Sequence, residues 1–162
     1  YLPEKFTFFG FETPLTALTF LGKLRGVQGG PGPQVQSCLE RAGIPDLAAR
    51  KLKTLSKGQL QRGGIAALLL GGPRVLFLDE PFSGLDPLGI KDLKGLITAL
   101  KKDGATIFVN SHILSEMEQI CDHFALLNRG ECLAQGPLKE TLGGQSLEDF
   151  FDAKVRPTGV DS

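Results

Sequence analysis

The stretch VLFLDEPFSGLDP, residues 75–87, constrains the fold of this chain more than any other part of its sequence. Its continuous apolar run, Val75 to Leu78, predicts a strand that is buried on both faces. Two adjacent carboxylates, Asp79 and Glu80, follow this strand directly. A carboxylate in such a place is able to hold Mg²⁺ directly or through water, and its neighbour is able to deprotonate an attacking water. The alternative is a strand-end pair that caps the next turn.

Strand and helix patterns alternate in the part of the chain that follows residue 75. Residues 87–102 predict a helix with one apolar face, and residues 105–112, ATIFVNSH, predict a second buried strand that ends on polar side chains. Strand–helix–strand alternation implies parallel pairing with a right-handed crossover. Ligands of such sheets bind at the carboxyl ends of the strands, which is where Glu80 and His112 stand.

The rest of the chain predicts shorter elements. Thr13 followed by Pro14 is typical of a helix start, and Ser56 is typical of another, although Gly63 and Gly64 weaken the helix that Ser56 begins. The spacing of apolar residues predicts helices over residues 14–24, 35–42, 47–52 and 57–70 in the first part of the chain. It predicts a helix over 115–121, a hairpin over 123–136, and short helices over 138–142 and 147–151 in the last part.

Residues at the ends of these elements are candidates for phosphate contacts. A helix that begins at Ser56 presents free N–H groups at its first turn, and Gly58 lets an anion approach closely; the alternative is an ordinary serine cap. A neutral imidazole at His112 is able to contact water or a γ-phosphate, or it is a satisfied strand-end residue. Asp86 is, in the simplest interpretation, the cap of the helix that begins at Pro87.

The composition argues against several classes of protein. Lysine plus arginine equals aspartate plus glutamate at 18 each, so the chain is not built to bind nucleic acid through bulk charge. The three cysteines, Cys38, Cys121 and Cys132, form no Cys-x-x-Cys pair and indicate a reducing, cytosolic setting. The densest apolar run, residues 65–70, is too short to cross a bilayer. The first residue is Tyr1 rather than methionine, which suggests a trimmed or incomplete chain.

Taken together and in order, these motifs resemble the nucleotide-binding domain of an ABC transporter. LSKGQLQR is similar to the signature motif of that family, with Lys57 in place of the usual first glycine. VLFLDEP resembles Walker B, SGLD resembles the D-loop, and NSH resembles the switch-histidine loop. YLPE, residues 1–4, resembles the Q-loop of the drug-export and ABC-2 branch, with Glu4 where most members carry glutamine.

The resemblance implies a role for each matching position. Asp79 would coordinate Mg²⁺ through water, Glu80 would act as general base on the attacking water, and His112 would contact the γ-phosphate and that water. Asp86 would communicate across a dimer interface, and metal sensing would fall to Glu4, which cannot donate a hydrogen bond when ionised. The positions implied to contact ATP are Ser56, Lys57, Gly58, Gln59, Asp86 and Glu4, and those implied to contact Mg²⁺ are Asp79 and Glu4.

The resemblance also implies an α/β fold. This is the P-loop NTPase-like parallel sheet of an ABC ATPase with a helical subdomain, and the N-terminal strands and the P-loop are missing from it. Residues 1–70 would hold the Q-loop, the helical subdomain and the signature helix. Residues 71–136 would hold the Walker B, D-loop and switch-histidine portion, and residues 137–162 a C-terminal helical tail. The exposed part of KFTFFGFETPLTALTF, residues 5–20, is either a surface that docks on membrane-spanning subunits or ordinary core.

The phosphate-binding pattern G-x-x-x-x-G-K-[ST] does not occur in the sequence. The only Gly-Lys pair, Gly22-Lys23, is followed by leucine and has Ala17 where the first glycine belongs. The simplest account is that the N-terminal portion of the protein is not in this sequence. Without the loop, the chain alone is expected to bind ATP weakly and to hydrolyse it negligibly. Missing strands would also leave an unpaired edge beside Val75 to Leu78.

The sequence therefore predicts an ATP-binding and ATP-hydrolysing subunit of an ABC transporter. It would work with Mg²⁺ in a nucleotide-sandwich dimer and drive partner membrane subunits from the cytoplasmic face of the membrane. The alternative is a P-loop-less, non-catalytic chain that donates its signature motif to a partner's ATP site. A soluble ABC ATPase that acts on DNA or ribosomes is disfavoured by the neutral charge. The sequence upstream of Tyr1 would separate the first two hypotheses.

Overall fold

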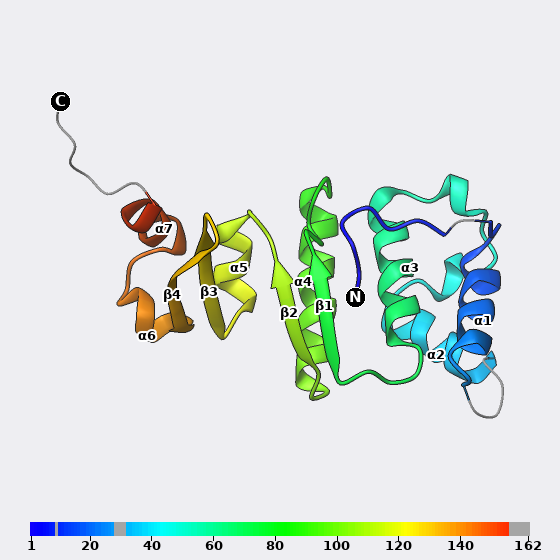
Figure 1. Ribbon diagram of the computed structural model, residues 1–162. Helices are drawn as coiled ribbons and strands as arrows, with labels where there is room; N and C mark the ends of the chain where they lie inside the picture. Colours follow the sequence, from blue (N-terminus) through cyan, green and yellow to red (C-terminus); the bar gives the residue numbers. More distant parts are fainter. Residues whose placement is uncertain (9, 28–31, 156–162) are drawn as a thin grey trace. The chain divides into compact units, whose positions relative to one another are not determined.

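The computed structural model describes residues 1–8, 10–27 and 32–155 of the 162-residue chain (Figure 1). The chain divides into two units, residues 1–111 and residues 112–162. Residues 156–162, the end of the predicted C-terminal tail, lie outside the described residues. The predicted division at residues 70 and 136 stays a prediction.

Unit 1 begins with helices, and most of them lie where the sequence predicts them. They are α1 (Pro14–Leu24), α2 (Gly32–Arg41), η1 (Pro45–Leu47), η2 (Leu52–Thr54) and α3 (Lys57–Leu69). The Thr13 cap is confirmed, because its hydroxyl accepts a hydrogen bond from Thr16 N at 3.2 Å. The single helix predicted over residues 47–52 is wrong. Two 3₁₀ turns stand there instead, because Lys51 is extended and Leu52 N donates to Glu12 O at 2.7 Å.

The glycine pair inside α3 serves close packing. A Cβ atom on Gly64 would lie 2.7 Å from Leu2 Cδ1 and 2.9 Å from Phe6 Cδ1, and one on Gly63 would lie 3.0 Å from Phe8 Cε2. The lower helix propensity of glycine is therefore offset by the approach of the N-terminal segment. This packing buries Leu2, which is 1% exposed, and fixes the segment that carries Tyr1.

The predicted strand–helix–strand unit is confirmed. Strand β1 (Val75–Asp79) pairs in parallel with β2 (Thr106–Asn110), and α4 (Pro87–Lys102) connects them. The register places Val75 opposite Thr106 and Asp79 opposite Asn110. Figure 1 shows α4 running along one face of the strand pair. Its apolar side is buried through Leu93, Leu96, Ile97 and Leu100.

The prediction that Val75 to Leu78 are buried on both faces is wrong, and so is the prediction that the second strand is buried. Leu76 and Leu78 are buried, but Val75, Phe77 and Phe108 are 49%, 48% and 56% exposed. Successive side chains of a strand point to opposite faces, so one covering layer buries only alternate residues. The Phe77 and Phe108 rings stack on the open face at 4.9 Å between centroids, with 10° between their planes.

The edge of β1 that does not face β2 is partly paired. Leu2 N donates to Phe77 O at 2.8 Å, and Asp79 N donates to Leu2 O at 2.9 Å, which forms a parallel bridge between Leu2 and Leu78. The prediction of an unpaired edge along the whole strand is therefore wrong at its carboxyl end. The pairing holds the start of the chain next to the end of β1.

Unit 2 contains the predicted hairpin and short helices. Its elements are α5 (Leu114–Ile120), β3 (His123–Asn128), β4 (Glu131–Pro137), α6 (Leu138–Leu142) and α7 (Leu147–Val155). Strands β3 and β4 are antiparallel, and Arg129 and Gly130 turn the chain with φ angles of 48° and 84°. Phe150 of α7 is buried and meets Phe124 edge-on at 5.6 Å between centroids. None of the helices in the described ranges has the length and apolar character that a membrane span requires.

Candidate functional site

Asp79, the last residue of β1, has a hydrogen-bond donor on each carboxylate oxygen. Asn110 Nδ2 donates to Oδ1 at 2.8 Å, and Tyr1 Oη donates to Oδ2 at 2.9 Å. The bond from Asn110 and then the bond from Tyr1 hold the pKa of Asp79 below its ordinary value, against a smaller opposing effect of burial. The site therefore presents an ionised carboxylate in one defined orientation.

The backbone pairing explains why these three side chains meet. Asn110 is the register partner of Asp79 in the parallel pair, so both stand at the same edge of the sheet. Tyr1 arrives from the other side, because its neighbour Leu2 bridges to Leu78. The hydrogen bond to Asp79 raises the pKa of the Tyr1 hydroxyl, which keeps that group protonated and able to donate.

Glu80 follows in an unusual backbone conformation. Its φ angle is 45°, in the left-handed region that residues other than glycine rarely adopt. Its N–H donates to Asn110 O at 2.8 Å, and its carbonyl accepts from Ser83 N at 3.1 Å. Ser111 Oγ donates to Glu80 Oε2 at 3.2 Å. A sharp turn therefore separates the two adjacent carboxylates, and each has its own donor from the end of β2.

Glu4 lies near the turn that follows Glu80. Ser83 Oγ donates to Glu4 Oε1 at 3.1 Å. The structure thus brings three predicted site residues, Glu4, Asp79 and Glu80, to the same end of the strand pair in unit 1. The role of Glu4 in metal sensing stays a prediction.

The signature stretch begins α3 with a reciprocal cap. Ser56 Oγ accepts from Gln59 N at 3.2 Å, and Gln59 Oε1 accepts from Ser56 N at 3.0 Å. The serine cap is confirmed, and the contacts of these residues with ATP stay a prediction. Lys57 lies against the turn after Glu80, since a Cβ atom on Gly84 would be 2.5 Å from Lys57 Nζ. Gly58 likewise faces that turn, where its Cβ would meet Leu85 Cδ2 at 3.5 Å.

Asp86 and His112 stand at two other element ends. Asp86 is exposed and caps α4, with Oδ1 accepting from Gly89 N at 2.7 Å, which confirms the simplest interpretation of this residue. His112 is an exposed residue in the bend between β2 and α5, and it is the first residue of unit 2. The functional roles of both residues stay predictions.

The donor set at Asp79 fits a magnesium ion that a nucleotide would share. Mg²⁺ is a hard cation that keeps several waters and is commonly bound by one or two carboxylates together with substrate phosphates. The described residues contain no group of three or more histidine, cysteine or carboxylate side chains arranged for a metal. One ionised carboxylate at a strand end therefore suits Mg²⁺ brought with phosphates rather than a permanent structural metal.

Sequence reasoning missed the residues that donate to the carboxylates: Tyr1, Ser83, Asn110 and Ser111. All four lie inside motifs that the sequence singles out, but the motifs by themselves assign these residues no role. The polar end of β2 was a usable signal for Asn110 and Ser111, because a parallel register brings it opposite Asp79 and Glu80. The signal for Tyr1 was weaker, because it depends on the bridge made by Leu2.

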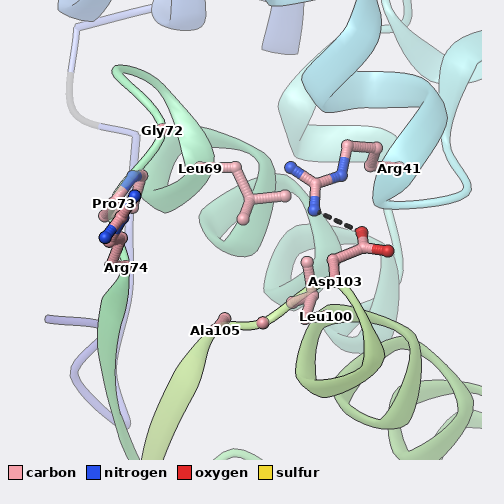
Figure 2. Close-up of a pocket in the computed structure, with 9 residues that line it drawn as sticks. Arg41, Leu69, Gly72, Pro73, Arg74, Leu100, Asp103 and Ala105 are labelled. Carbon is pink, nitrogen blue, oxygen red and sulfur yellow. Dashed lines mark hydrogen bonds and ion pairs between the residues drawn. The ribbon is translucent and has the colours of Figure 1, made fainter.

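A cavity of about 360 Å³ lies at the opposite end of the strand pair. Its walls are the last turns of α2, α3 and α4, residues 72–74 before β1, and residues 103–105 before β2. Figure 2 shows the Arg41 guanidinium pointing at the Asp103 carboxylate, to which it is ion-paired at 2.8 Å. None of the predicted site residues lines this cavity.

Comparisons with known proteins agree with the motifs. A family model described as ABC transporter matches residues 4–83. An uncharacterized ABC transporter ATP-binding protein of Synechocystis sp. is 45% identical over 150 residues, which cover 88% of this chain and 41% of that protein. The bacitracin transport ATP-binding protein BcrA of Bacillus licheniformis is 40% identical over 132 residues, which cover 79% of this chain and 42% of that protein. The chain thus spans less than half the length of these two relatives.

A solved structure supports the fold. The structure described as an ATP binding subunit of an ABC transporter aligns with a TM-score of 0.80 and 27% identity, and the alignment covers 96% of this chain and 68% of that one. The fold is therefore the α/β fold of ABC ATPase subunits, as the sequence predicts. The chain belongs to the family of ABC transporter ATP-binding proteins.

Proposed function

We propose that the protein of which this chain is a part binds and hydrolyses ATP to drive an ABC transporter. The observation that carries the proposal is the pair of carboxylates at the end of β1, Asp79 and Glu80, each held by a separate donor from the end of β2. The matches to a bacitracin transport ATP-binding protein and to an ATP binding subunit support it.

The two carboxylates have different tasks in the proposed mechanism. Mg²⁺ bound with ATP would neutralise charge that develops on the phosphates. Asp79 would hold that ion through water, since its carboxylate is ionised and oriented by Asn110 and Tyr1. Glu80 would accept the proton of the attacking water, with its carboxylate held by Ser111. His112 would contact the γ-phosphate and the same water.

The signature stretch would serve a second subunit. In the proposed nucleotide-sandwich dimer, Ser56, Gly58 and Gln59 at the start of α3 would close over ATP held by the partner. Asp86 would communicate across the same interface. The packing of Lys57 against Gly84 supports a shared surface, because it places the signature stretch beside the turn that leads to Asp86.

The surface of α1 is the proposed contact with membrane-spanning subunits. Helix α1 has a buried face and an exposed face, since Ala17 and Leu18 are fully buried while Phe20 and Leu24 are 46% and 68% exposed. The Phe20 ring lies 5.2 Å from the Phe11 ring, which extends the exposed apolar surface. Docking here would hold the protein at the cytoplasmic face of the membrane.

The first test uses the purified 162-residue chain. We expect weak ATP binding and no hydrolysis above background, because the sequence contains no loop that would hold the phosphates. Binding is measured by titration calorimetry and hydrolysis by phosphate release. Hydrolysis that the chain performs and Glu80→Gln abolishes would contradict this expectation.

The second test uses the protein as its own genome encodes it, tagged and purified from detergent-solubilised membranes. We expect membrane-spanning subunits to co-purify and the preparation to hydrolyse ATP with Mg²⁺. Glu80→Gln should remove hydrolysis and leave co-purification unchanged. Absence of both hydrolysis and membrane partners would refute the proposed function.

A further inference from the structure

We infer that Asn110 is a positioning residue for the metal-binding carboxylate of Asp79, with Tyr1 as a second, weaker positioning residue. The inference rests on the proposed function, since it assumes that Asp79 faces a divalent cation. It adds residues to which neither the family match nor the relatives assign a task. A positioning residue acts through the carboxylate and does not itself contact the ion.

The contact geometry is the first support for the inference. The two donors occupy different oxygens of one carboxylate, at 2.8 Å for Asn110 Nδ2 and 2.9 Å for Tyr1 Oη. Both distances lie within the normal range for hydrogen bonds. A carboxylate bonded through only one oxygen keeps freedom to rotate about its last torsion, whereas two donors on two oxygens define its plane.

The chemistry of the donors is the second support. Asn110 and Tyr1 are neutral, so they orient the carboxylate and keep it ionised without cancelling its negative charge. An arginine or lysine in the same place would compete with the cation for that charge. In unit 1, arginine side chains pair with Asp103 (from Arg41) and with Asp92 (from Arg62), whereas the donors on Asp79 are neutral.

The backbone is the third support, because the two donors come from the two segments that pair with opposite edges of β1. Asn110 is fixed opposite Asp79 by the parallel register, and its carbonyl accepts the N–H of Glu80 at 2.8 Å. Tyr1 is placed by the bridge between Leu2 and Leu78. The carboxylate is thus held from both sides of β1, which is the arrangement that pre-organises a metal ligand.

The test measures Mn²⁺ binding to the ¹⁵N-labelled chain by paramagnetic broadening of amide signals. Substoichiometric MnCl₂ is expected to broaden the signals of residues around Asp79, and Asp79→Asn is expected to remove this broadening. Asn110→Ala should lower the apparent Mn²⁺ affinity about tenfold, the lower end of the effect of residues that orient metal ligands. Tyr1→Phe, which deletes one exposed oxygen, should lower it by a smaller factor.

The matched control is Thr106→Ala. Thr106 lies on the same strand as Asn110, is exposed in the same way and stands opposite Val75, far along the register from Asp79. Its substitution should leave Mn²⁺ broadening unchanged, and its melting temperature should match that of Asn110→Ala. If Asn110→Ala does not fold, Tyr1→Phe carries the test, because Tyr1 is 70% exposed and the change removes only its hydroxyl group.

The outcomes separate the inference from the proposed function. Broadening that depends on Asp79 and weakens with Asn110→Ala but not with Thr106→Ala supports the inference. Equal affinity in Asn110→Ala, Tyr1→Phe and Thr106→Ala overturns the inference and leaves the metal role of Asp79 intact. Broadening that is absent, or that persists in Asp79→Asn, overturns the inference, whereas the proposed function, in which Mg²⁺ arrives with ATP, is refuted only by the absence of hydrolysis and membrane partners in the second test above.

Discussion

The two ends of the β1–β2 pair hold their carboxylates in different ways. At the carboxyl end, Asp79 and Glu80 accept hydrogen bonds from the neutral side chains of Asn110, Tyr1 and Ser111. At the other end, Asp103 is paired with the Arg41 guanidinium at 2.8 Å. Both ends contain short, well-formed contacts, so hydrogen-bond distance alone does not distinguish them.

The difference lies in the charge that remains. A neutral donor fixes the direction of a carboxylate and leaves its negative charge for a third group, whereas arginine satisfies geometry and charge together. Asp92 of α4 is likewise satisfied by arginine, since it pairs with Arg62 at 2.8 Å. Asp79, whose two donors are neutral, is therefore a candidate for chemistry, whereas the carboxylates of Asp103 and Asp92 pair with arginine and join elements of the fold.

The largest expected effect tests this comparison directly. Asp79→Asn should abolish Mn²⁺-induced broadening of neighbouring amide signals, whereas Asp103→Asn should leave the broadening unchanged, because Asp103 already has a cationic partner. Both changes remove one negative charge from unit 1, so they match in net charge. The measurement is an amide NMR titration with MnCl₂. Equal loss of broadening in the two variants would show that net charge, rather than the local partners, attracts the ion.

A second prediction concerns the packing that supports the carboxyl end. Gly64→Ala should lower the free energy of unfolding by about 1–3 kcal/mol, because the new Cβ would lie 2.7 Å from Leu2 Cδ1 and 2.9 Å from Phe6 Cδ1. Displacement of Leu2 should also loosen Tyr1 from Asp79. Chemical denaturation measures the loss of stability, and the Asp79 amide signal reports the displacement.

Gly95→Ala is the matched control for that prediction. Gly95 lies in the middle of α4, and a Cβ added there meets nothing within 4 Å. Alanine should raise stability by about 0.5–1 kcal/mol through helix propensity alone. The idea that Gly64 is required for close packing fails if both substitutions change stability in the same direction.

A third prediction concerns the ion pair at the opposite end. A double-mutant cycle of Arg41→Ala and Asp103→Ala should give a coupling of about 0.2–1 kcal/mol, because the two side chains are 40% and 60% exposed. The coupling should fall in about 1 M salt, where the screening length is roughly 3 Å. Denaturation at low and high salt measures it. A coupling that is large and independent of salt would contradict a surface ion pair.

The smallest effect is on the pH dependence of stability. The pKa of Asp79 is held below its ordinary value of 3.8, first by Asn110 and then by Tyr1. The contribution of Asp79 to stability is therefore present above that value and is lost as pH falls through the lowered pKa. Asn110→Ala should raise the pKa toward the ordinary value, and Tyr1→Phe should raise it less. Titration of the Asp79 carboxyl carbon by ¹³C NMR measures both shifts, and an unchanged pKa would contradict them.

Local signals in the sequence predicted the elements well. The cap at Thr13, the cap at Ser56 and the helix over residues 87–102 depend on interactions within a few residues of the chain, and the structure has all three. The hairpin also follows from its Asn-Arg-Gly turn, which adopts positive φ angles at Arg129 and Gly130. Interactions of this kind involve residues that are close together in the chain, so they can be predicted before any tertiary contact is known.

The predictions that were wrong or missing concern features that depend on contacts between residues distant in the chain. The helix predicted over residues 47–52 gives way to two turns because Leu52 N pairs with Glu12 O, 40 positions away. Apolar sequence in β1 did not reveal which face is covered, since Phe77 and Leu78 have the same hydrophobic character and opposite exposure. The donors Tyr1 and Asn110 became visible only once the register of β1 was known.

The backbone at Glu80 has a consequence for protein engineering. Its φ angle of 45° is free of strain for glycine, whereas the left-handed conformation costs other residues about 1–2 kcal/mol. A library screened for thermal stability alone should therefore enrich glycine at position 80 and discard the carboxylate. Position 80 would then act as an internal gauge of such a screen, because its drift toward glycine would show that stability was being gained at the expense of the proposed general base.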